Sequence, residues 1–183
     1  MSVPTISPLL RHPGAPCSGP DRLEVTATHL ADGGLILYYR LFGRPELIRT
    51  PAQKPPGPAD GLWQHTCCEA FVAEAGTAYR EFNFSPSGQW ASYRFTDYRK
   101  RDEVYAPAAQ PHLAFSLLPD GFALQATIPA TLLPVDERPD LGLTAIIEAA
   151  DGSKSYWALT HCAAQPDFHL RQSFTLALNR PAP

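Results

Sequence analysis

The chain has 183 residues, a formal net charge of −3 and an apolar content of 44%. This length is typical of a single domain and is enough to bury a core without metal or disulfide cross-links. The charge excludes the strongly basic surface that attracts nucleic acid, and no apolar run approaches the roughly 20 residues of a membrane span. We therefore expect neither nucleic acid nor a membrane as a partner.

The first residues, MSVPTISPLLRHPG, lack the basic region and the long apolar region of a signal peptide. This predicts a cytoplasmic protein, although a chain from which a leader had been removed would look the same. The sequence contains 20 prolines, many of them between strand-like runs, and this distribution argues against long helices. Residues 1–20 are rich in proline and weakly patterned, so we expect a surface arm there, followed by one domain over residues 21–183.

Strand signals begin after this arm. Residues 23–30 and 35–42 have alternating or apolar patterns and flank Asp32-Gly33-Gly34, which is typical of a hairpin turn. The Pro-rich residues 44–61 break regular structure. A connection of this length is often functional, but it can also be an exposed loop that simply tolerates length.

The clearest local pattern lies in residues 62–101. Residues 66–73, 79–84 and 89–95 are rich in strand formers, and the side chains of residues 79–84 alternate between two faces. The segment Ser85-Pro86-Ser87-Gly88 fits a type I turn, with proline at its second position and glycine at its fourth. This pattern predicts a three-stranded antiparallel meander.

The remaining chain continues in short strands. A helical turn is expected at residues 129–133, and strands are expected at residues 112–118, 122–128, 141–150, 155–160 and 173–178. The total of about ten short strands separated by Gly/Pro turns predicts an all-β fold, an antiparallel β-sandwich or, as the alternative, a barrel.

Two motifs, LWQHTCCEAF from Leu62 and YREFNFSPSGQWASYRFTDYR from Tyr79, resemble the DOMON-like domains related to family 9 carbohydrate-binding modules. The resemblance is to small, stand-alone bacterial members and extends from about Leu23 to Leu178. It implies a β-sandwich. The broader superfamily contains sugar binders and, in some branches, haem binders.

A sugar presents a flat C–H face that stacks on aromatic rings and hydroxyl groups that need planar polar partners. Family 9 modules hold a terminal sugar between two tryptophans, and the resemblance implies Trp63 and Trp157 as this pair by approximate position. Tyr98, Arg99 and Gln165 could supply polar contacts at the rim. Core packing is the alternative role for each tryptophan, and it is the role that we expect for Trp90.

Cofactor binding has weaker support. Met1 is the only methionine, so the Met/His ligation of haem iron in haem-binding relatives is absent. Ligation of haem iron by two histidines stays open, because the domain contains His29, His65, His112, His161 and His169. A transition-metal site is a further alternative. The loops that contain His65, His161, Asp167 and His169 could share one end of the sandwich and bind a metal there. We predict no cofactor and no metal.

No motif of an established enzyme class occurs. Glu69 and Glu81 lie on strands expected to be neighbours, and two carboxylates are the minimum requirement for glycoside hydrolysis. Two such residues more often form hydrogen bonds or salt bridges. The sequence therefore predicts a non-catalytic binding module for a sugar or glycoconjugate. The alternatives are a protein-interaction or scaffold domain without a small ligand, a haem binder, and a glycoside-acting enzyme; the oligomeric state is left open.

Overall fold

The computed structural model describes residues 5–15, 18–135 and 139–177. Residues 1–4 and 16–17 of the expected N-terminal arm and Leu178, at the end of the last expected strand, lie outside these residues. The regular structure of the described residues is almost entirely β-strand. Four short 3-10 helices occur among them: η1 (Pro45–Leu47), η2 (Leu62–Gln64), η3 (Ala130–Leu132) and η4 (Arg171–Ser173). None of the described helices is long and apolar enough to cross a membrane.

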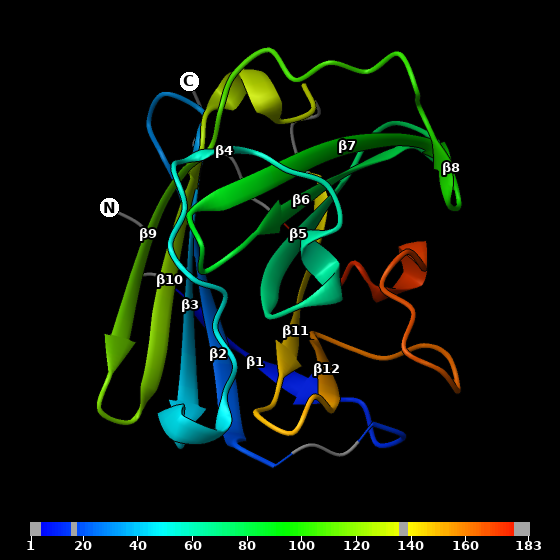
Figure 1. The fold of residues 1–183 in the computed structure, drawn as a ribbon. Coiled ribbons are helices and arrows are strands. Elements are labelled where there is room, and N and C mark those ends of the chain that lie inside the picture. Colours follow the sequence, from blue (N-terminus) through cyan, green and yellow to red (C-terminus); the bar gives the residue numbers. More distant parts are fainter. Residues whose placement is uncertain (1–4, 16–17, 136–138, 178–183) are drawn as a thin grey trace.

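The strands form two curved sheets (Figure 1). Sheet A contains, in spatial order, β1 (Thr5–Arg11), β2 (Pro20–His29), β3 (Leu35–Gly43), β10 (Gly121–Ile128) and β9 (His112–Leu118). Sheet B contains β4 (Gly57–Pro58), β7 (Gln89–Asp97), β6 (Tyr79–Phe84), β5 (Cys67–Ala73), β11 (Asp140–Glu148) and β12 (Lys154–Ala158). The short β8 (Lys100–Arg101) pairs with β7, and β13 (Leu176–Ala177) pairs with β11. All pairs are antiparallel except β4 with β7, which confirms the predicted all-β class.

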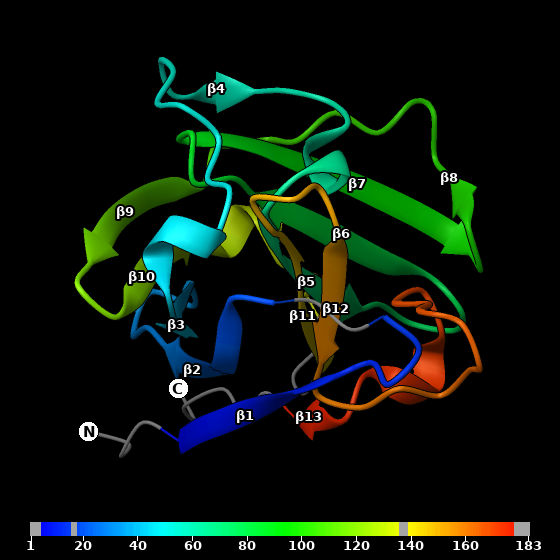
Figure 2. The same cartoon turned by 60° about the horizontal axis from the view of Figure 1, so that its bottom comes forward.

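The expected N-terminal arm is in fact a strand that joins the two sheets. The first part of β1 pairs with β2 in sheet A, and its last residues, Leu10 and Arg11, pair with Ala158 and Trp157 of β12 in sheet B. Figure 2 shows β1 passing along the bottom of the molecule between β2 and β12. A strand that passes from one sheet to the other forms a corner between them. The interpretation of this segment as a surface arm is therefore wrong for residues 5–11.

Alternate residues of both sheets form the main core. Leu37 and Tyr39 of β3 and Leu124 of β10 meet Phe82 of β6 and Leu143 of β11 in one fully buried cluster. The Tyr39 hydroxyl donates a hydrogen bond of 2.7 Å to the backbone carbonyl of Glu69, so the polar end of this core side chain is satisfied. The meander of β5, β6 and β7 and most other strands lie where the alternation predicts them.

Sheet B is also covered on its other face. A second buried cluster there contains, among others, Phe71 of β5, Phe95 of β7, Phe168 and Phe174. The last two come from the segment between β12 and β13, which folds back over the sheet (Figure 1). The central strands β5 and β11 are consequently buried on both faces, which explains their nearly continuous apolar sequences.

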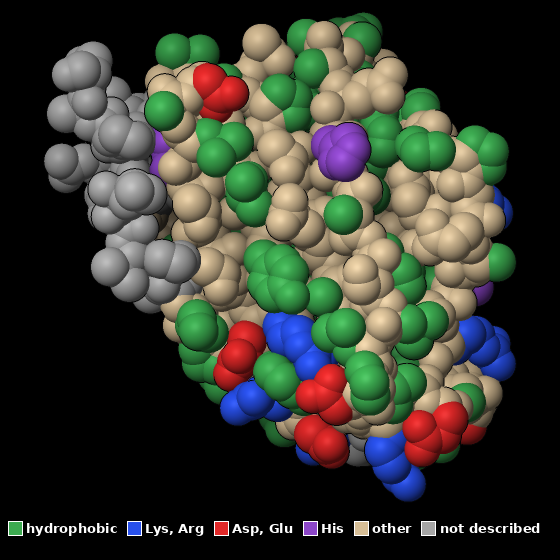
Figure 3. All heavy atoms as spheres, turned by 90° about the vertical axis from the view of Figure 1, so that its left-hand side faces the viewer, with side chains coloured by type: hydrophobic (Ala, Val, Ile, Leu, Met, Phe, Trp, Pro, Cys, Tyr) green, Lys and Arg blue, Asp and Glu red, His purple; other side chains and the backbone are tan. Residues whose placement is uncertain are grey.

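In contrast, no segment among the described residues covers the outward face of sheet A. Its side chains are mostly uncharged along the strands, and charges gather at one end (Figure 3). There Arg22 and Arg40 each place a guanidinium carbon 4.0 Å from the centre of the Phe42 ring, and Arg40 pairs with Asp120. This face therefore carries both charged groups and exposed apolar side chains, among them Ile6 and Tyr38.

A testable consequence concerns the hairpin between β9 and β10. Gly121 has φ +139°, and a Cβ there would lie 2.1 Å from the carbonyl oxygen of Leu41 on β3. Gly152 also has a positive φ, of +86°, but a Cβ there would meet no atom within 4 Å. Gly152→Ala should cost about 1–2 kcal/mol, whereas Gly121→Ala should cost about 3 kcal/mol or more because the backbone must also move. Equal losses in chemical denaturation would contradict this difference.

Candidate binding site

A cleft of about 840 Å³ lies on the face of sheet B that points away from the main core. Its floor consists of side chains that alternate with the core residues along the same strands. From β5 and β6 these are Glu69, Phe71 and Glu81. From β7, β11 and β12 they are Tyr93, Phe95, Ile146, Lys154 and Tyr156.

Three connecting segments form the walls of the cleft. The segment before β5 contributes Asp60, Gly61, Trp63 and Gln64. The turn into β8 contributes Arg99 and Arg101. The segment after β12 contributes Pro166, Phe168 and His169. Segments far apart in the sequence therefore surround one site, which we call the cleft throughout.

The first wall depends on the Pro-rich residues 44–61. Strand β4 runs parallel to the start of β7, Ala59 donates a backbone hydrogen bond to the carbonyl of Trp90, and Lys54 donates one to the carbonyl of Ser87. These bonds attach the long connection to the edge of sheet B and carry the chain to Trp63. The connection is therefore an ordered part of the cleft.

Trp63 is the aromatic side chain most accessible to a ligand in the cleft. It lies in η2 and remains 50% exposed, whereas Trp90 and Trp157 are 4% and 5% exposed. Across the floor, Tyr93 and Phe95 from β7 and Tyr156 from β12 add further aromatic surface. The cleft thus offers flat apolar surfaces on several sides.

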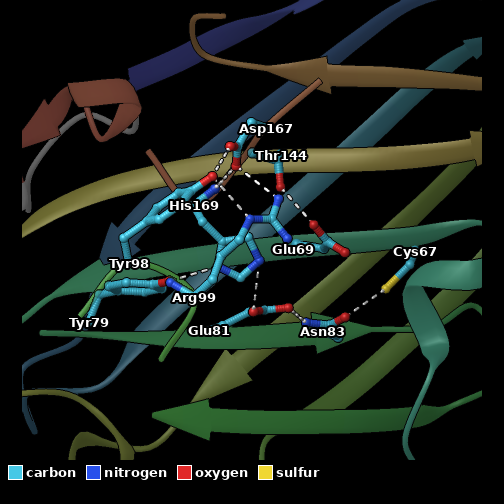
Figure 4. A network of polar contacts seen from close by, with 10 residues as sticks. All are labelled: Cys67, Glu69, Tyr79, Glu81, Asn83, Tyr98, Arg99, Thr144, Asp167 and His169. Carbon is cyan, nitrogen blue, oxygen red and sulfur yellow. Dashed lines mark hydrogen bonds and ion pairs between the residues drawn. The ribbon is translucent and has the colours of Figure 1, made fainter. Parts of the chain in front are cut away.

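Two carboxyl groups lie on the floor. Residue Glu69 pairs in register with Asn83, two residues beyond Glu81 on the neighbouring strand, so the two glutamates are diagonal neighbours on one face of the sheet. Thr144 donates a hydrogen bond of 3.1 Å to Oε2 of Glu69, and Asn83 donates one of 2.6 Å to Oε1 of Glu81. Both donors are neutral, and both lie on the same face of sheet B (Figure 4).

An ion-pair network links two walls of the cleft. Arg99 pairs with Asp167 at 3.0 Å, and the Tyr98 hydroxyl donates a hydrogen bond of 2.6 Å to the other oxygen of the same carboxylate. Arg99 has a positive φ of +53°, and no other non-glycine residue in the described part of the chain has a positive φ. Such a conformation costs of order 1–3 kcal/mol and persists where surrounding contacts impose it. Here the contacts place the guanidinium at the cleft.

His169 connects this network to the floor. The Tyr79 hydroxyl accepts a hydrogen bond from the backbone N–H of Arg99, so its own proton is free to be donated to Nδ1 of His169, 2.7 Å away. The ring then carries its proton on Nε2, which lies 3.8 Å from Oε2 of Glu81. Figure 4 shows this series of contacts from Asp167 to Glu81.

Burial changes the acid–base properties of these groups. Burial raises the pKa of Glu81 to about 7, although the Asn83 hydrogen bond and the charges of Arg99 and Arg101 act in the opposite direction. Burial and then the charge of Glu81 raise the pKa of Glu69 well above its ordinary value. Burial and then the charge of Arg99 lower the pKa of His169 to about 4, so the imidazole is neutral at neutral pH.

The site residues expected from the sequence are only partly brought together. Trp63 and Arg99 line the cleft. Tyr98 does not line it but holds Asp167 beside it, and Gln165 is exposed next to the lining residue Pro166. Trp157 lies on the opposite face of sheet B.

The expected pairing of Trp63 with Trp157 is therefore revised. Trp157 belongs to the main core between the two sheets, and its indole N–H donates a hydrogen bond of 2.9 Å to the Ser155 hydroxyl. The next residue in the strand, Tyr156, points to the opposite face and lines the cleft. The aromatic residue that β12 contributes to the cleft is therefore Tyr156, one position before the expected Trp157.

Several cleft residues were not expected from the sequence as ligand contacts, notably Tyr93, Phe95, Tyr156 and Phe168. A usable signal existed in β5, because residues 67–73 are apolar on both faces and this pattern indicates that something covers the outer face. Among the described residues, no group of three or more histidine, cysteine or acidic side chains could hold a metal ion. His65 and His161 instead contact Glu148 and the Leu10 carbonyl.

The assignment of Trp157 to the core can be tested by substitution. Trp157→Ala should lower the free energy of unfolding by about 3–5 kcal/mol because it leaves a cavity between the sheets. Trp63→Ala removes a half-exposed side chain and should change stability by about 1 kcal/mol or less. Urea denaturation of both variants measures the two effects, and similar losses would argue against the separate roles.

The raised pKa of Glu81 predicts a dependence of stability on pH. A folded-state pKa of about 7 lies above the ordinary 4.5, so the stabilising contribution is complete below pH 4.5 and is lost as the pH rises through 7. Glu81→Gln removes this titration. The variant should therefore gain about 3 kcal/mol relative to the wild type between pH 4.5 and 8, at 1.36 kcal/mol per pKa unit. Denaturation at several pH values tests this, and a constant difference would refute it.

Comparison with known proteins gives structural but not sequence relatives. No protein-family model matches the sequence, and no curated protein matches it either. A proposed carbohydrate-binding protein from Bacteroides uniformis superposes with a TM-score of 0.72 at 15% identity, over 93% of this chain and 84% of that one. A family 9 carbohydrate-binding module from Caldicellulosiruptor kristjanssonii superposes with a TM-score of 0.55 at 11% identity in each of two structures. Its complex with cellotriose matches over 93% of this chain and 86% of that one. Its complex with glucose matches over 94% of this chain and 87% of that one. The chain thus shares the fold of family 9 carbohydrate-binding modules.

Proposed function

We propose that the chain is a non-catalytic binding module for a sugar or glycoconjugate and that the cleft on sheet B is its binding site. The observation that carries this proposal is the half-exposed indole of Trp63 at the wall of a cleft whose floor contains buried, incompletely hydrogen-bonded carboxyl groups. We also propose that the chain is related to the DOMON-like branch of the family 9 superfamily through the motifs from Leu62 and Tyr79.

The composition of the cleft suits a sugar for a physical reason. A pyranose needs one flat apolar surface for its C–H face and several polar groups around its edge for its hydroxyls. Trp63, Tyr156 and Phe168 supply the apolar surfaces. Gln64, Arg101 and the floor glutamates supply donors and acceptors around them. The volume of about 840 Å³ is in the range of small-molecule sites and exceeds what one monosaccharide needs.

The structural neighbours support the same proposal. The two structures of the Caldicellulosiruptor kristjanssonii module contain cellotriose and glucose, and the Bacteroides uniformis protein is described as carbohydrate-binding. At sequence identities of 11–15%, the likeness to these proteins shows a shared fold and does not by itself identify the ligand. The proposed ligand is therefore inferred from the cleft itself.

A glycoside-acting enzyme is the second candidate, because Glu69 and Glu81 do line one cleft. A retaining glycosidase needs one protonated carboxyl and one carboxylate that stays ionised as the nucleophile. Here burial raises the pKa of both carboxyl groups, and among the described residues no arginine or lysine is hydrogen-bonded to either of them to keep it ionised. The pair is therefore better suited to binding than to catalysis.

Titration calorimetry with glucose, N-acetylglucosamine, glucosamine and cellotriose tests the proposed function. At least one sugar should bind, and Trp63→Ala should weaken its binding by about tenfold or more because the stacking surface is lost. Tyr38→Ala is the matched control, since Tyr38 is an exposed aromatic residue on the outer face of sheet A. Heat release without saturation for every sugar, or equal effects of the two substitutions, would reject the proposal.

The same titrations can be followed by fluorescence. Trp63 is the exposed tryptophan, while the other two are buried. A bound sugar should shift the emission of the wild type and protect it from an aqueous quencher. The Trp63→Ala variant, checked for folding by circular dichroism, should show neither effect.

A further inference from the structure

The floor of the cleft contains two carboxyl oxygens for which the described residues supply no hydrogen-bond donor. Oε2 of Glu69 is bonded to Thr144 and Oε1 of Glu81 to Asn83, but within the described part of the chain no donor lies within hydrogen-bond distance of Oε1 of Glu69 or Oε2 of Glu81. The two side chains are 2% and 5% exposed. The carboxyl groups of side chains as buried as these normally have partners for both oxygens, so the two open oxygens indicate a place for a ligand that donates hydrogen bonds.

The nearby arginines do not fill this place because each has another carboxylate. Arg99 is bound to Asp167 at 3.0 Å. Arg101 lies 4.0 Å from Asp60 and stacks on the Tyr93 ring, with its guanidinium carbon 4.3 Å from the ring centre. Both arginines influence Glu81 through their charge, but across the described residues no arginine or lysine nitrogen lies within 4.0 Å of either floor carboxyl.

Lys154 lines the cleft at its other end. It pairs in register with Glu148, four residues along β11 from Thr144, while Thr144 pairs with Glu69 on the next strand. The Cα atoms of Lys154 and Glu69 are therefore two strands apart across the sheet and four residues apart along it. These perpendicular displacements combine to a separation of roughly 16 Å. The lysine ammonium therefore does not serve as the counter-ion of the floor carboxyls.

The surroundings of Glu81 also favour a cation. Glu81 lies in register between Phe71 on β5 and Tyr93 on β7, so an aromatic ring flanks it on each side. Aromatic faces and carboxylates together are the groups that recognise an ammonium in a partly desolvated site. The stacking of Arg101 on Tyr93 shows that this row of the sheet already accommodates one cation.

We propose that the ligand is an amino sugar whose primary ammonium binds between Glu69 and Glu81, with the sugar ring on the aromatic surfaces above them. An ammonium has three donors, enough to reach one oxygen of each carboxyl group and leave one for a water molecule or the ring. This inference rests on the proposed sugar-binding function and names its ligand class. It also explains why two acidic side chains lie together in a cleft that has arginines at its rim.

The test compares glucosamine with glucose and N-acetylglucosamine, in which the amine is absent or uncharged, by titration calorimetry at neutral pH. Wild-type protein should bind glucosamine about tenfold or more tightly than either neutral sugar. Glu81→Gln and, separately, Glu69→Gln should reduce this preference to less than about threefold while neutral sugars still bind. Glu24→Gln, on the outer face of sheet A, is the charge-matched control and should retain the full preference.

The outcomes separate this inference from the proposed function. If neutral sugars bind as tightly as glucosamine, or if glucuronic acid binds most tightly, the ammonium site is refuted and sugar binding stands. A preference for glucosamine that survives both glutamine substitutions also refutes it. If no sugar binds at all, the proposed function fails and this inference fails with it. Because the wild-type comparison needs no variant, poor folding of a variant does not decide the result.

Discussion

Burial of sheet B on both faces is the constraint on which the rest of the structure depends. One face of sheet B packs against sheet A. The other face would expose Phe71 of β5, Phe95 of β7 and Ile146 of β11 if nothing covered it. The segment after β12 supplies Phe168 and Phe174 for this purpose. Its cover is incomplete, and the uncovered part of the apolar face is the cleft. The cleft is thus a consequence of how a two-sided sheet is covered.

The same alternation determines what could be predicted from the sequence. Local patterns identify the meander and most other strands because strand side chains change face at every residue. They also show that β5 and β11 are mostly apolar on both faces, with Glu69 and Thr144 among the polar exceptions. Strand β1 was missed because Pro8 and the surrounding sequence carry no strand pattern, and its pairing with both β2 and β12 is a long-range property.

The candidate site was harder to predict for two reasons. It depends on which face of a strand each side chain lies on, and it brings together residues that are far apart in the sequence. Trp157 and Tyr156 are neighbours in sequence, and a change of one position decides which of them lies in the core and which in the cleft. Local sequence carries no information about the contact of Arg99 with Asp167, 68 residues apart. Trp63 does line the cleft, because η2 and the strand after it are adjacent in sequence.

The energetic character of the cleft argues for a ligand. Two carboxyl groups in an apolar setting, a neutral imidazole and the positive φ of Arg99 each cost folding free energy relative to an ordinary core. Natural proteins keep such costs mainly where function requires them. Hydrophobic residues at these positions would cover the sheet at lower cost, as Phe174 does beside them. The proposed ligand would account for the polar floor, because the fold alone does not need it.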